Sequence, residues 1–137
     1  MRILYILCLV LLVGCKKERF EDKFNWHTIK VTASAYNSTK SQTDGSPFLT
    51  AYGDSLKPGL HCIAVSKDLI KKGLTHNTPV KIEGFDSIYF VKDRMHPRWR
   101  NKIDIYMGLD VKAAKKWGRK KVEIQYGILK DSLLQDK

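Results

Sequence analysis

The hydrophobic and polar positions of this chain alternate in short runs, a pattern typical of β-strands rather than of helices. Six runs are rich in β-branched and aromatic residues, and turn-forming residues separate them. The runs occupy residues 28–33, 62–65, 79–83, 88–91, 103–107 and 122–126. Six short strands within about 100 residues predict a mainly β domain, built as a small barrel or a sandwich.

Two segments break the alternation and carry the boundary signals of helices. Ser66 is a candidate N-cap for a helix over residues 67–72, and Gly73 ends it. Asp110 is the candidate N-cap of a second helix, which stops at Gly118. We therefore expect two short helices beside the six strands.

Residues 36–59 contain Ser, Thr, Gly and Pro throughout and show no periodicity. A connection of this length inside a compact domain is more often functional than idle. We therefore expect this loop to contribute to a binding site.

The first fifteen residues have the pattern of an export signal. Arg2 precedes an apolar run over residues 3–14, which is too short to span a bilayer because spanning takes about 20 residues. The run ends in Leu-Val-Gly-Cys, which resembles the lipobox of bacterial lipoproteins, where the cysteine is lipidated and becomes the first mature residue. Cys15 is that cysteine. The alternative is an ordinary short signal that happens to contain cysteine.

The chain is accordingly divided into a signal peptide at 1–15, a tether at 16–25 and one domain at 26–137. The tether is mostly charged and lacks periodicity, and several acyl chains on one cysteine anchor a protein stably to a membrane. Lys16 is not the aspartate that commonly retains lipoproteins at the inner membrane. We expect a monomer in the bacterial cell envelope, anchored to the outer membrane and facing the periplasm.

The charge of the chain narrows the class of partner. It has 25 Lys+Arg against 14 Asp+Glu, a net charge of +11. In a cytosolic protein this excess would favour nucleic acid, but an exported lipoprotein meets anionic head groups and the carboxylate-bearing cell-wall polymer instead. A solubilising surface charge explains scattered lysines equally well. It explains the basic cluster at 92–102 less well.

Asp104 stands out because it lies in the middle of an apolar run. Strand alternation places Ile103 and Ile105 on one face and Asp104 on the other. Apolar neighbours that exclude water raise the pKa of a carboxyl group, and so does a second carboxylate nearby. Asp93 is the candidate second carboxylate, and the two meet if their strands are adjacent. An aspartic acid with a raised pKa can act as a general acid.

Several further positions around these two aspartates form a recognisable pattern. They are Tyr36, Thr50-Ala51-x-Gly53, Ile63-Ala64-Val65, Val80-x-Ile82-x-Gly84, Asp93, and Asn101-Lys102-Ile103-Asp104-Ile105-Tyr106-Met107-Gly108. In these positions residues 28–126 resemble the three-aspartate (3D) domain, the catalytic module of membrane-bound murein lytic transglycosylase A and related cell-wall enzymes.

The resemblance implies a six-stranded double-psi β-barrel that acts on peptidoglycan without a metal or other cofactor. It implies that Asp104 is the acid/base that protonates the glycosidic oxygen between N-acetylmuramic acid and N-acetylglucosamine. The sugar's own 6-hydroxyl is then the nucleophile, and the product is a 1,6-anhydro sugar. Asp93 would tune Asp104. Further substrate contacts are implied at the matching positions Tyr36, Thr50, Asn101 and Lys102.

The chain departs from the family pattern at the first aspartate. Ser66 stands in its place, and the nearest carboxylate is Asp68, two positions later. Ser66 and Asp68 remain candidate substrate contacts. The alternative is that Asp68 is only an acidic residue at a helix N-terminus.

A second departure replaces the family's glycine-rich loop with Met95-His96-Pro97-Arg98-Trp99-Arg100. Trp99 is a candidate to stack on a sugar face, while Arg98 and Arg100 are candidates to hold lactyl or stem-peptide carboxylates. The alternative is a solvated basic loop with Trp99 packed against the barrel.

Three functions are compatible with these observations. The first is a lytic transglycosylase with Asp104 as its acid/base. The second is a non-catalytic glycan-binding module on the same barrel, in which the basic loop and Trp99 supply the affinity. The third is a structural lipoprotein without a ligand.

Overall fold

The computed structural model describes residues 14, 16–39 and 48–131, so residues 1–13 and the lipidation candidate Cys15 lie outside it. The described chain is mainly β, with six strands and two α-helices, as predicted. The elements are the 3-10 helix η1 (Phe20–Lys23), β1 (Phe24–Tyr36), β2 (Cys62–Val65), α1 (Lys67–Lys71), β3 (Pro79–Ile82), β4 (Ile88–Arg94), β5 (Lys102–Tyr106), α2 (Val111–Trp117) and β6 (Lys120–Leu129). Within this part of the chain, no helix is long and apolar enough to cross a membrane.

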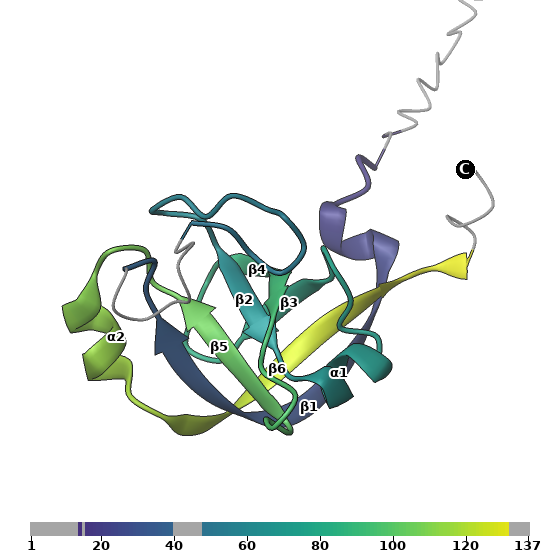
Figure 1. Ribbon diagram of the computed structural model, residues 1–137. Helices are drawn as coiled ribbons and strands as arrows, with labels where there is room; N and C mark the ends of the chain where they lie inside the picture. The colour runs from purple at the N-terminus through teal and green to yellow at the C-terminus, as the bar shows by residue number, and fades with distance from the viewer. Residues whose placement is uncertain (1–13, 15, 40–47, 132–137) are drawn as a thin grey trace, which may run out of the picture.

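The six strands close into a barrel in the order β1-β5-β2-β4-β3-β6 (Figure 1). Strand β5 lies between the consecutive strands β1 and β2, parallel to β1 and antiparallel to β2. Strand β2 likewise lies between β4 and β5, parallel to β4. Each arrangement, with one strand inserted between two connected antiparallel strands, is a psi motif. The two motifs interlock, and the expected double-psi β-barrel is confirmed.

The barrel interior is filled by the inward-facing residues of every strand. The side chains of Ile63, Val65, Val91, Ile103 and Ile105 are all fully buried there. Because β5 alternates strictly, its intervening residues face outward. The predicted division of β5 into a core face and an outer face is therefore confirmed.

The domain begins earlier than the sequence indicated, because the predicted tether over 16–25 overlaps ordered elements. Trp26 Nε1 donates a hydrogen bond to the carbonyl oxygen of Glu21 (3.0 Å), and Lys81 Nζ pairs with the Glu21 carboxylate (2.8 Å). The ring of Phe20 lies 5.0 Å from that of Phe24. The first residues of β1 pair with the end of β6 and alternate between partly buried and exposed positions.

A second, smaller hydrophobic cluster covers part of the outer face of β5 and β2. Leu56 packs there with Cys62 and Tyr106, and Tyr36 and Leu60 border them. Residues 48–60 thus fold back over the barrel. Residues 40–47 of the same loop lie outside the described part.

Ser66 occupies the N-cap position of α1, but its side chain makes no capping bond. Its hydroxyl oxygen accepts a hydrogen bond from Lys102 N–H (3.0 Å), and its own N–H donates to the Lys102 carbonyl oxygen (2.9 Å). Ser66 is fully buried, so it joins β2 to the start of β5 and is not accessible to a ligand.

Replacing Ser66 with alanine is expected to lower the free energy of unfolding by about 1–3 kcal/mol, because the Lys102 N–H is left buried without an acceptor. Urea unfolding followed by circular dichroism measures this. The matched control is Ser87→Ala, at an exposed position, which is expected to change stability by less than about 0.5 kcal/mol. Equal effects for both variants would contradict the assignment.

Candidate functional site

Four residues form a row across the outer face of the barrel. Ser34 of β1 pairs with Asp104 of β5, Asp104 pairs with Ala64 of β2, and Ala64 pairs on its other side with Asp93 of β4. Residues paired directly across strands point to the same face. We call Ser34, Asp104, Ala64 and Asp93 the acidic row. The two aspartates are therefore brought to one face, as the sequence suggested.

The sequence predicts that Asp93 and Asp104 meet if their strands are adjacent, but β4 and β5 are not adjacent. Because β2 lies between them, their Cα atoms are separated by two strand spacings, about 10 Å. A β-bulge in β4 leaves Lys92 without a partner on β2. This extra residue brings Asp93 into line with Ala64. The small Ala64 side chain forms the floor between the two carboxylates.

Asp104 has the electrostatic environment expected of an acid. The pKa of Asp104 is raised to about 6, chiefly by burial, and the nearby Asp93 carboxylate contributes to the rise. The Ser34 hydroxyl donates a hydrogen bond to Asp104 Oδ1 (3.0 Å), and this bond opposes the rise, as do the charges of Lys102 and Arg119. Asp104 therefore exchanges its proton near neutral pH.

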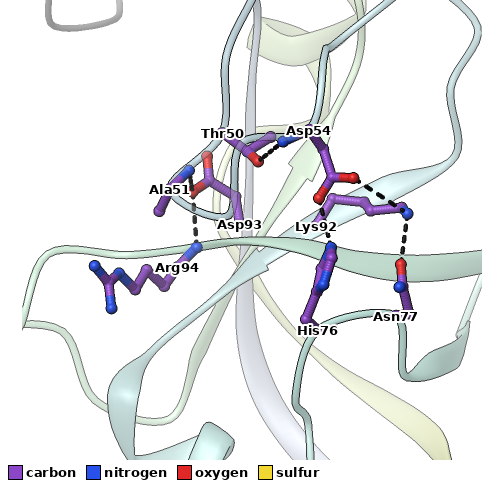
Figure 2. A network of polar contacts seen from close by, with 8 residues as sticks. All are labelled: Thr50, Ala51, Asp54, His76, Asn77, Lys92, Asp93 and Arg94. Atoms are coloured by element: carbon purple, nitrogen blue, oxygen red, sulfur yellow. Dashed lines mark hydrogen bonds and ion pairs between the residues drawn. The ribbon is translucent and has the colours of Figure 1, made fainter.

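Asp93 is held by backbone donors instead. One of its carboxylate oxygens, Oδ1, accepts hydrogen bonds from the N–H groups of Ala51 and Arg94, both at 2.8 Å (Figure 2). Ala51 belongs to the loop that folds back over the barrel. Asp93 thus connects this loop to the acidic row.

A polar network beside Asp93 fastens the same loop to the barrel (Figure 2). Asp54 of the loop pairs with His76 Nε2 (2.5 Å) and with Lys92 Nζ (3.6 Å), and Lys92 also donates to Asn77 Oδ1. The ring of Tyr52 stacks on that of His76, with centroids 4.7 Å apart. The network thus joins the loop to β4 and to the turn that precedes β3.

Replacing Asp54 with asparagine is expected to speed hydrogen exchange at the Ala51 N–H about 2- to 5-fold, because the ion pair with Lys92 is partly exposed and such a pair contributes about 0.2–1 kcal/mol. Amide exchange measured by NMR tests this. Asp86→Asn, at an exposed carboxylate outside the network, is the control and should leave the rate unchanged. An unchanged rate in the Asp54 variant would show that the contacts of Asp54 do not protect the Ala51 N–H from exchange.

Tyr36, a candidate substrate contact, lies near both aspartates. Burial raises the pKa of its hydroxyl, and the nearby Cys62, Asp93 and Asp104 add to the effect. The Cys62 thiol is fully buried, and burial raises its pKa to about 12, so it stays protonated. Thr50 is differently placed, because its hydroxyl accepts the Asp54 N–H (3.0 Å) and shapes the loop.

The predicted substrate contacts in and beside the basic loop differ in their partners. Arg98, Trp99 and Lys102 lie together, and Lys102 interacts electrostatically with Asp104. Arg100 instead closes its own loop, because its Nη1 donates to the carbonyl oxygens of Pro97 (2.6 Å) and Trp99 (3.1 Å).

Asp68 and Asn101 form a structural contact at the start of β5. Asp68 Oδ2 accepts the Asn101 N–H (2.9 Å), and Asn101 Nδ2 donates to the Lys30 carbonyl oxygen (3.1 Å). Burial raises the pKa of Asp68, but the Ser66 hydroxyl, the Asn101 N–H and nearby Arg100 outweigh it, so the net shift is downward. These bonds engage the side chains of two candidate substrate contacts, Asp68 and Asn101.

Two residues near Asp104 were missed by the sequence reasoning. Ser34 shares a strand face with Tyr36, so alternation along β1 was a usable signal. No sequence pattern indicated that Arg119 lies near Asp104, because its position depends on how α2 leads into β6.

No family model and no curated protein matches this chain. Among solved structures, the apo form of the expansin of Clavibacter michiganensis is similar, with a TM-score of 0.45 and 17% sequence identity over 77% of this chain and 52% of that one. The chain thus spans about half the length of that neighbour. A similarity this weak carries no argument about ligands, and the fold assignment rests on the strand order described above.

Proposed function

We propose that this protein binds glycan strands of peptidoglycan across the outer face of β1, β5, β2 and β4. The acidic row is the observation that carries the proposal. Ser34, Asp104 and Asp93 are each only partly covered, and carboxylates are strong acceptors for the hydroxyl groups of sugars. The resemblance of residues 28–126 to 3D domains supports peptidoglycan as the polymer.

Cosedimentation of the purified domain with peptidoglycan sacculi tests the proposal. Asp104→Leu is expected to weaken binding about 10- to 100-fold, because a hydrogen bond to a charged group contributes about 1.5–3 kcal/mol. Asp86→Leu is the matched control and should bind as the wild type does. If the wild-type domain stays in the supernatant, or if both variants bind equally well, the acidic row is not a glycan site.

Cleavage of the bound strand is the second candidate function, and the raised pKa of Asp104 favours it. The Asp104 carboxyl would donate its proton to the glycosidic oxygen, so that the N-acetylglucosamine side leaves as an alcohol. The 6-hydroxyl of the muramic acid residue then attacks its own C1, and its proton returns to Asp104. One carboxyl group serves both steps, so this lytic transglycosylation needs no second carboxylate.

We further propose that Cys15 carries a lipid anchor and that the protein resides in the bacterial cell envelope, at the periplasmic face of the outer membrane. The Leu-Val-Gly-Cys ending of the apolar run supports this. Cys15→Ser should abolish incorporation of labelled palmitate and release the protein from the membrane fraction. Labelling that persists in this variant would exclude Cys15 as the acceptor.

A further inference from the structure

Three cations surround the indole ring of Trp99, and two of them, Lys102 and Arg119, act electrostatically on Asp104. Lys102 Nζ lies 3.7 Å from the ring centroid, and the guanidinium carbons of Arg98 and Arg119 lie 4.9 Å and 5.6 Å from it. These contacts come from the basic loop, from β5 and from the segment that leads into β6. We call Arg98, Lys102 and Arg119 the cation cluster.

The positive charge of the cation cluster is not balanced by ion pairs. Within the described residues, none of its members forms an ion pair. Lys102 is only 6% exposed, and its pKa is lowered by burial and by the charges of Arg119 and Arg98, with Asp104 as the opposing influence. Arg98 and Arg119 are exposed, so an anion from outside the chain can reach the cluster and would reduce the repulsion among its three charges.

The position of the cluster indicates where that anion would sit on a bound sugar. Lys102 and Asp104 are two residues apart on the outer face of β5, which corresponds to about 7 Å. When a sugar ring contacts Asp104, a substituent of that ring can extend over this distance to Lys102. A guanidinium group binds a carboxylate through paired hydrogen bonds, and the cluster supplies two such groups.

We infer that the cation cluster binds the lactyl carboxylate of muramic acid and so selects carboxylate-bearing glycan strands over neutral β-1,4-linked glycans. The inference rests on the proposed function, because it places the sugar ring on the acidic row. In intact peptidoglycan the lactyl group is an amide wherever a stem peptide is attached. The site therefore favours strands whose muramic acid carries a free lactyl carboxylate.

The test follows the indole N–H resonance of Trp99 by NMR while the intact mature domain is titrated with N-acetylmuramic acid. Two neutral probes are titrated in parallel, the methyl ester of the same sugar and N-acetylglucosamine. N-acetylmuramic acid is expected to bind at least 5-fold more tightly than either. Arg119→Gln should weaken its binding about 5- to 10-fold, whereas Lys72→Gln, which removes an exposed charge at the end of α1, should not.

The remaining outcomes of this test distinguish a failure of the carboxylate site from a failure of the proposed function. Equal affinity for the acid and its ester, in a domain that still cosediments with sacculi, would remove the carboxylate site and leave the proposed function standing. Selective binding of the acid without any binding to sacculi would leave the carboxylate site and remove the proposed function. An equal response to inorganic phosphate would show a general anion site, such as one for lipid head groups, and would overturn the assignment to a sugar.

Discussion

Replacing Asp104 with asparagine is expected to stabilise the protein at neutral pH by up to about 3 kcal/mol. The pKa of Asp104 rises from 3.8 to about 6 on folding, and each unit corresponds to about 1.4 kcal/mol. The figure is an upper limit because the side chain is partly exposed. Asparagine keeps the shape of the side chain and the acceptor for Ser34 but carries no charge, so the cost of burying the carboxylate disappears.

The pH dependence identifies the cause of this gain. Because the folded state holds the proton more tightly than the unfolded state, the wild type loses stability as pH rises through the window from about 4 to about 6. Thermal unfolding of both proteins between pH 3.5 and about 8 should show a difference that is smallest at the acidic end and complete above about pH 6. Asp86→Asn is the control. A difference that stays constant with pH would rule out the buried charge as its origin.

If the protein cleaves peptidoglycan, Asp104→Asn is expected to reduce the release of 1,6-anhydro muropeptides about 10²- to 10⁴-fold, the contribution typical of a general acid or base. Asparagine cannot donate a proton to the glycosidic oxygen. Its amide oxygen still accepts hydrogen bonds, although without the charge, so the variant should lose less binding to sacculi than Asp104→Leu does. Mass analysis of soluble products gives the rate, and cosedimentation gives the binding.

The wild-type rate should also fall as pH rises through about 6, because Asp104 loses the proton it must donate. Asp54→Asn is a useful comparison, because it disturbs the loop without removing a carboxylate from the acidic row. If the wild type binds sacculi but releases no anhydro product, catalysis is excluded and the binding function remains.

Local features of this chain could be predicted from its sequence because local interactions determine them. The alternation of Ile103, Asp104 and Ile105 follows from strand geometry. Asp110 caps α2 as expected, by accepting the Ala113 N–H (2.9 Å). Both depend on neighbours within a few positions.

The features of the site that could not be predicted depend on strand order, which brings together residues far apart in the chain. The local pattern of the sequence does not indicate that β2 is inserted between β4 and β5, so the separation of Asp93 and Asp104 could not be predicted from alternation, and only the resemblance implied a double-psi strand order. The role of Ser66 was missed for the same reason, because its partner Lys102 is 36 positions away. Arg119 approaches Asp104 from the end of α2, again through the tertiary fold.

The position of Ala64 between the two aspartates has a consequence for how this barrel can diversify. The spacing of Asp93 and Asp104 is set by the hydrogen-bond ladders that each strand makes with β2, and not by the connection from one strand to the other. Residues 95–101 can therefore change in size and charge while the acids keep their separation. Trp99 and the basic residues of this segment can therefore be exchanged to change ligand preference without moving the two acids.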